Sequence, residues 1–146
     1  MTRLEYDWWA LNADKDDPEV IEIMSRTEPH GYTEPELNEL RGRTERAFIG
    51  GLLIAGVVPA SLRSLDLKPK HFLLPPLAAA WTEIQKHEDF DRLEIERGLA
   101  EAGKMSFLAA GTILAETLDN AACATDLSKY GKRIIEGWGR ARTARP

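Results

Sequence analysis

Apolar residues recur along most of this chain at the three- and four-residue spacing that places them on one face of an α-helix. None of the long periodic stretches shows the alternation of β-branched and polar residues that is typical of a half-buried strand. The pattern therefore predicts an all-α fold.

The most apolar of the predicted helices begins near Thr44, and its apolar residues lie on nearly all sides, as in an element at the centre of a fold. Gly50 and Gly51 fall within it. Because no predicted strand precedes these glycines, we expect them to allow close packing of a neighbouring segment and not to bind phosphate. The apolar residues of this helix are Ala47, Phe48, Ile49, Leu52, Leu53 and Ile54.

Amphipathic helices follow this central helix. Pro75 and Pro76 are expected in the first turn of one of them, where a helix tolerates proline. The predicted core positions of three successive helices are Leu77, Trp81 and Ile84, then Ile95, Leu99 and Ala102, and then Phe107, Gly111, Leu114 and Leu118.

The last two amphipathic helices are separated by a short polar break at Asp119 and Asn120. Because consecutive helices joined in this way usually pack against each other, we predict an antiparallel hairpin over residues 105–141, after a compact bundle over residues 44–104. The pattern leaves open whether the apolar seam of the hairpin is covered by the chain itself or by a second subunit. The candidate seam and partner-interface residues are Leu114, Leu118, Leu127, Tyr130, Ile134 and Trp138.

The first part of the chain has a different character. Residues 1–40 hold three basic residues against eleven acidic ones, a net charge of −8. We predict short polar helices there, one over residues 19–26 and one from a capping box at residues 33–36 through Leu40, which together are too polar to bury a core. Trp8 and Trp9 are either docked onto the chain's own domain or a possible partner anchor. We therefore expect an acidic arm over residues 1–43 and a helical domain over residues 44–146.

The far end of the chain is basic, with six basic residues against one acidic residue over residues 129–146. Such a tail binds phosphate by releasing counterions, but basic residues near the end of a solvated helix also suit its dipole without any ligand. The possible nucleic-acid contacts are Lys129, Lys132, Arg133, Arg140 and Arg142.

Motifs of catalysis and metal binding are missing from the sequence. A Walker A loop is absent, the three histidines lack metal-ligand spacing, and the single Cys123 forms neither an intrachain disulfide nor a C-x-x-C zinc motif. The longest uncharged run, over residues 47–62, is too short to span a membrane, and the acidic amino end does not resemble an export signal. We expect a cytoplasmic protein that is not an enzyme and has no catalytic residues, cofactor or metal.

Five stretches of the sequence, in order over residues 44–138, together resemble one family. The run Glu45-Arg46-Ala47-Phe48-Ile49-Gly50-Gly51 and the step formed by Leu67, Pro69 and Phe72 are similar to the amino-terminal domain of DnaB-type hexameric replicative DNA helicases. Three later sets extend this resemblance: Pro75 and Trp81; Asp91, Ile95, Leu99 and Gly103; and Leu114, Glu116, Asn120, Ala124, Leu127 and Tyr130.

The resemblance implies a collar module of a helicase ring, built as a bundle with a projecting hairpin. In that family the hairpins pair between subunits, the collar receives the primase, and catalysis belongs to a following ATPase domain that this chain does not contain. We therefore expect a non-catalytic DNA-replication assembly module of bacterial or phage origin, either a free-standing protein or a fragment of a helicase. It is expected to dimerise and to contact a replicative helicase, a primase or a helicase loader. The alternative is a small helical DNA-binding regulator that uses the basic C-terminal helix.

Overall fold

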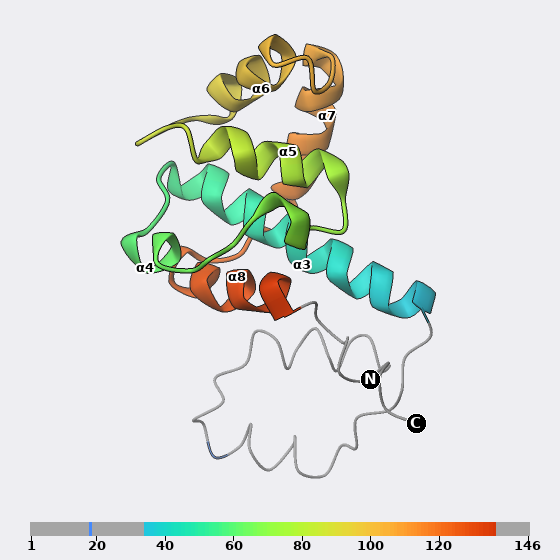
Figure 1. The fold of residues 1–146 in the computed structure, drawn as a ribbon, viewed down its shortest axis with the longest axis vertical. Coiled ribbons are helices and arrows are strands. Elements are labelled where there is room, and N and C mark those ends of the chain that lie inside the picture. The colour runs from blue at the N-terminus through green and yellow to red at the C-terminus, as the bar shows by residue number, and fades with distance from the viewer. Residues whose placement is uncertain (1–17, 19–33, 137–146) are drawn as a thin grey trace. The chain divides into compact units, whose positions relative to one another are not determined.

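The computed structural model of the 146-residue chain describes Pro18 and residues 34–136. Helices and short 3-10 turns make up the secondary structure of residues 34–136, which contain no β-strand, and this confirms the predicted all-α class (Figure 1). In chain order the elements are α3 (Glu34–Ala55), α4 (Ala60–Arg63), η1 (Pro69–His71), α5 (Pro75–Ile84), α6 (Arg92–Glu101), α7 (Phe107–Thr117), η2 (Ala124–Asp126) and α8 (Leu127–Glu136). The helix predicted over residues 19–26 lies outside the described residues.

The chain divides into two units, and the larger one comprises Arg41–Trp138. The smaller unit comprises Met1–Leu40 and Gly139–Pro146, of which only Pro18 and the first residues of α3 are described. The two helices predicted through Leu40 and from Thr44 are in fact one helix, because α3 runs unbroken from Glu34 to Ala55. Gly42 is buried inside this helix, and a Cβ atom there would lie 3.0 Å from Arg46 Nη1, so this glycine gives room to a neighbouring side chain and does not end the helix.

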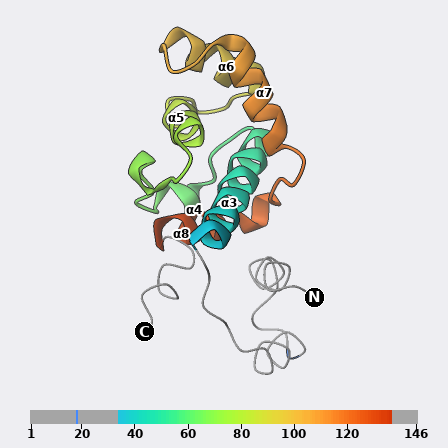
Figure 2. The same ribbon diagram turned by 90° about the vertical axis from the view of Figure 1, so that its right-hand side faces the viewer.

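Helix α3 lies at the centre of the larger unit (Figures 1 and 2). Phe48 is fully buried, with its ring centroid 6.2 Å from that of Phe72 and 5.5 Å from that of Trp81. The prediction that this helix is apolar and buried on most sides holds through Leu53 and fails at Ile54, which is 67% exposed. The buried apolar residues of this part of α3 are Ala47, Phe48, Ile49, Leu52 and Leu53.

Helices α5, α6 and α7 pack in sequence, α5 against α6 and α6 against α7. Pro75 occupies the first position of α5, as predicted. Asp91 caps α6 by accepting a 2.8 Å hydrogen bond from the backbone N–H of Glu94, and Ser106 caps α7 in the same way from Ala109 at 3.1 Å. A short turn over residues 102–106 joins α6 to α7, and the two helices pack against each other.

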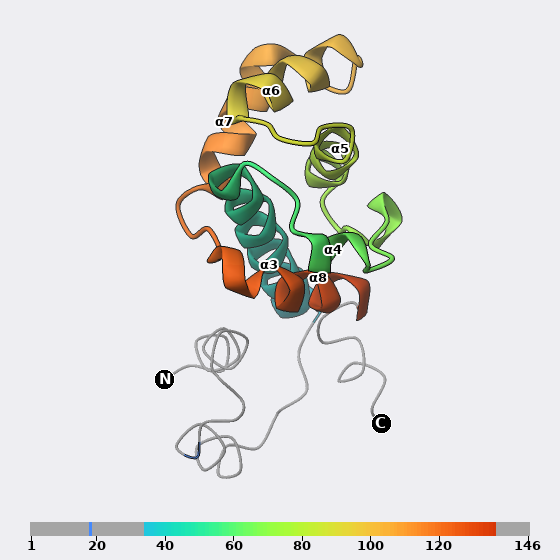
Figure 3. The same cartoon turned by 90° about the vertical axis from the view of Figure 1, so that its left-hand side faces the viewer.

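The hairpin predicted from the last two helices is not formed. Helix α8 packs against α4 at the end of the unit opposite α6, while α7 packs against α6 (Figures 1 and 3). The reason is the connection from Leu118 to Asp126, which is long enough to cross α3. There the backbone N–H of Ala122 donates a 2.9 Å hydrogen bond to the carbonyl oxygen of Ala47.

Gly50 and Gly51 make this crossing possible, which confirms the close packing predicted for them. A Cβ atom on Gly50 would collide with the carbonyl oxygen of Thr117, and one on Gly51 would lie 2.6 Å from the carbonyl oxygen of Ala122. Helix α8 makes a similar close approach at Gly131, where a Cβ atom would lie 2.9 Å from Leu62 Cδ1. The chain thus carries the apolar face of α8 across α3 to a different partner helix.

Candidate functional site

The residues predicted for the hairpin seam lie mostly inside the larger unit. Leu114 and Leu127 are fully buried, Tyr130 is 2% exposed and Ile134 is 4% exposed, while Leu118 is partly exposed. A side chain that its own chain already covers offers no surface to a second subunit. Burial favours coverage of these residues by the chain itself, but not through a hairpin seam, because α7 and α8 pack against different helices. Trp138 lies outside the described residues.

The basic residues predicted to contact nucleic acid are only partly within the described chain. Lys132 on α8 is exposed, whereas Lys129 and Arg133 are partly buried. The Nη1 atom of Arg133 lies 4.0 Å from a carboxylate oxygen of Glu136, one helical turn away. Arg140, Arg142 and the possible partner anchor formed by Trp8 and Trp9 lie outside the described residues.

Glu45 is a buried carboxylate on α3. Its side chain projects from α3 towards the start of α5, where its carboxylate oxygens accept hydrogen bonds from the backbone N–H groups of Leu73 (2.7 Å) and Leu74 (3.0 Å). Burial raises the pKa of this carboxyl above its ordinary value, opposed by those two hydrogen bonds and by the charges of Arg41 and Arg46. Because only 1% of Glu45 is exposed, this carboxylate is not accessible to a substrate. It acts as a strut, meaning a structural link between α3 and the start of α5.

Two further carboxylates are buried among α5, α6 and α7. Glu83 lies 2.9 Å from His87 Nε2 and 3.3 Å from Lys86 Nζ, and its side chain fills the space that a Cβ on Gly98 would take. Glu96 Oε1 lies 3.1 Å from Arg92 Nε at an angle that makes an ion pair and no hydrogen bond. Within residues 34–136, no group of three or more His, Cys, Asp or Glu side chains is arranged to hold a metal ion.

The start of α7 leaves two adjacent large apolar side chains in solvent. Leu108 is 81% exposed and Phe107 is 47% exposed. Sequence reasoning expected Phe107 in the core and did not single out Leu108. The helical period contained the signal, because Leu108 lies about 120° around the helix from the buried Leu114, at roughly 100° per residue. This pair is called the α7 apolar patch below.

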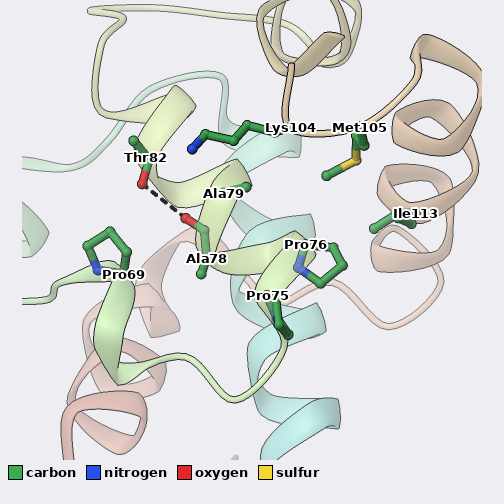
Figure 4. Close-up of a pocket in the computed structure, with 9 residues that line it drawn as sticks. All are labelled: Pro69, Pro75, Pro76, Ala78, Ala79, Thr82, Lys104, Met105 and Ile113. Carbon is green, nitrogen blue, oxygen red and sulfur yellow. Dashed lines mark hydrogen bonds between the residues drawn. The ribbon is translucent and has the colours of Figure 1, made fainter. Parts of the chain in front are cut away.

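A groove of about 460 Å³ lies between α5 and α7 (Figure 4). Neither residue of the α7 apolar patch lines it. Pro69 of η1, the α6–α7 turn and α7 contribute part of the lining, and α5 contributes all the rest. Sequence reasoning missed this groove, since no spacing along the chain reveals which helix faces leave a gap between them. The lining residues are Pro69, Pro75, Pro76, Ala78, Ala79, Thr82, Lys104, Met105 and Ile113.

Comparison with known proteins adds no relative to this picture. No protein-family model, no curated protein and no solved structure matches the chain. Among the helices of the described part, none has the length and apolar character needed to cross a bilayer. The surfaces themselves are therefore the basis for a functional proposal.

Proposed function

We propose that this chain is a non-catalytic assembly module of DNA replication, acting in the cytoplasm, that associates with itself and with a replicative helicase, a primase or a helicase loader. The observation that carries the proposal is the α7 apolar patch. Leu108 leaves most of its side chain in water at 81% exposure, and Phe107 stands beside it.

Covering this patch would be favourable. Moving a leucine or phenylalanine side chain from water into an apolar contact is worth roughly 1.5–3 kcal/mol. A single exposed leucine is ordinary on a protein surface, whereas here a second large apolar residue next to it in sequence, about 100° around the helix, is exposed as well. In a two-fold dimer the same patch contacts its own copy, so each of the two residues is buried once in each subunit and contributes twice to the free energy of association.

The sequence resemblance suggests the role of such a contact. In DnaB-type amino-terminal domains, helical hairpins pair between subunits to form the collar of the ring. In this chain the consecutive helices joined by a short turn and packed against each other are α6 and α7, and the α7 apolar patch lies on this pair. We therefore assign self-association to this pair and no longer to the residues of the predicted seam.

Binding to replication proteins tests the proposed function. The protein is mixed in turn with a purified replicative helicase, a primase and a helicase loader, and complexes are detected by size-exclusion chromatography with light scattering. We expect a complex with at least one of the three. An Ile54→Glu variant, altered at an exposed apolar residue on α3, serves as the control and should bind equally well. Failure of all three partners to bind would contradict the assignment to replication.

The alternative of a DNA-binding regulator predicts a different result. Fluorescence titration with duplex and single-stranded oligonucleotides would then show binding that strengthens steeply as salt falls. Such binding should also be lost in a Lys132→Glu variant, because Lys132 is exposed on the basic helix α8. That combination would favour the DNA-binding function over the assembly module.

A further inference from the structure

We propose that the groove between α5 and α7 binds the apolar face of an acidic amphipathic helix from a partner protein. This inference names the class of partner for the assembly module and rests on that proposed function. It concerns a surface separate from the α7 apolar patch, since neither Phe107 nor Leu108 lines the groove.

The lining favours a protein segment over a small molecule. All but two of the lining residues are apolar, the exceptions being Thr82 and Lys104. Pro69 and Pro75 are nevertheless exposed to solvent. A small-molecule site covers about 70–90% of its ligand, which an open groove of this kind does not do. A helix laid into a groove needs cover on only one face, where its apolar residues recur every three or four positions.

The shape of the groove suits a helix in particular. Ala78, Ala79 and Thr82 lie on neighbouring turns of α5 and have short side chains, which lets a second helix approach closely. Thr82 also donates its hydroxyl to the carbonyl oxygen of Ala78 at 3.2 Å, so its one hydrogen-bond donor is already used. On the α7 side, the flexible side chain of Met105 adjusts to apolar groups of different shape.

Charge at the edges of the groove selects an acidic partner. Lys104 is the single charged residue in the lining, and its side chain extends over α5 with the amine towards Thr82 (Figure 4). Lys70 follows Pro69 at the η1 edge and is also exposed. Within residues 34–136 neither ammonium group has an ion-pair partner, whereas the neighbouring Lys68 lies 3.6 Å from Asp66. Carboxylates on the polar border of an incoming helix would meet both free lysines.

Three labelled peptides of about four helical turns test this proposal with the full-length protein. The first has leucines at positions i, i+3, i+4 and i+7 flanked by glutamates, the second replaces the glutamates by lysines, and the third is a scrambled acidic sequence. Fluorescence anisotropy measures binding. We expect the acidic amphipathic peptide to bind at least about tenfold more tightly than either of the others.

Two variants locate the binding in the groove. Lys104→Glu reverses its one internal charge, and we expect it to weaken the acidic peptide by about tenfold and to strengthen the lysine peptide. Ala79→Phe fills the floor and should weaken both. Lys132→Glu makes the same charge change on α8 and should leave peptide binding as it is in the unaltered chain. Circular dichroism confirms that each variant is folded.

Other outcomes overturn the proposal. Equal binding of the acidic and scrambled peptides would contradict the proposal that the partner segment is an amphipathic helix. Equal affinity of Lys104→Glu and the unaltered chain for the acidic peptide would contradict the proposal that the groove is the binding site. A concentration-dependent dimer that Ala79→Phe abolishes would assign the groove to a second copy of this chain. Oligonucleotide binding that Lys104→Glu abolishes would assign it to nucleic acid. Peptide binding is measured on the isolated protein, so a failed complex with replication proteins would count against the proposed function alone.

Discussion

The carboxylate of Glu45 accepts a 2.7 Å hydrogen bond from the backbone N–H of Leu73, although 28 residues separate the two in sequence. The same carboxylate accepts a second hydrogen bond from Leu74, the residue that precedes α5. One side chain of α3 therefore fixes where α5 begins. Pro75 and Pro76 follow directly and line the groove, so this strut also positions one of its borders.

Removing the strut should destabilise the fold. Glu45→Ala leaves the partly buried N–H groups of Leu73 and Leu74 without their acceptor, and an unsatisfied buried group costs about 1–3 kcal/mol. We expect the free energy of unfolding to fall by about 2–4 kcal/mol in urea denaturation. Glu101→Ala, at an exposed carboxylate, is the control and should change it by less than about 0.5 kcal/mol. A similarly small loss for Glu45→Ala would show that the two hydrogen bonds contribute little.

The free energy of unfolding should depend on pH partly through the titration of Glu45. Burial raises its folded-state pKa above the unfolded value, so the folded chain binds this proton more tightly than the unfolded chain does. The contribution of Glu45 to stability is therefore fully present below the unfolded pKa and is lost as pH rises through the folded pKa. Glu45→Gln cannot titrate. We expect the unfolding free energy of the unaltered chain minus that of Glu45→Gln to decrease as the pH rises above the ordinary carboxyl pKa of 4.5. A difference that grows over that range would contradict the raised pKa.

Two glycine-to-alanine changes should have opposite effects. In Gly50→Ala the new methyl group meets the backbone oxygen of Thr117, which cannot swing aside, and we expect a loss of about 2 kcal/mol or more. In Gly111→Ala the nearest atom lies 3.7 Å away, on Glu96, which is ordinary contact. That variant should be more stable by about 0.5–1 kcal/mol, because alanine favours the helix over glycine. Thermal unfolding of both proteins is the measurement, and equal effects would argue against the crossing at Gly50.

The seam residues should behave as core and not as interface. Leu127→Ala removes a fully buried side chain, and we expect it to lower the unfolding free energy by about 2–5 kcal/mol. The dissociation constant of any dimer should stay the same. If Leu127→Ala instead kept its unfolding free energy and lost self-association, the seam residues would form a subunit interface.

Much of the fold follows from local patterns in the sequence. The period of apolar residues placed Leu77, Trp81 and Ile84 correctly in the core, and Pro75 marked the start of α5. These features depend on a residue's own helix and its immediate neighbours. A short stretch of sequence is therefore enough to predict them.

The arrangement of helices was less predictable. An apolar stripe such as that of Leu127, Tyr130 and Ile134 shows that α8 must be covered, but it does not say which helix covers it. The answer depends on the path of residues 118–126 over α3, which is set by glycines some 70 residues earlier. Gly42 is another such case, because a glycine that ends a helix and one that relieves crowding inside it look alike in sequence.

Self-association through the α7 apolar patch is the central claim, and multi-angle light scattering tests it most directly. At high micromolar concentration we predict that the unaltered chain has twice its 16.3 kDa mass, and that Leu108→Glu has the mass of a single chain. Leu108 is 81% exposed, so the variant should fold normally. A single-chain mass for the unaltered protein at the highest concentration, or a stable dimer in Leu108→Glu, would contradict the account.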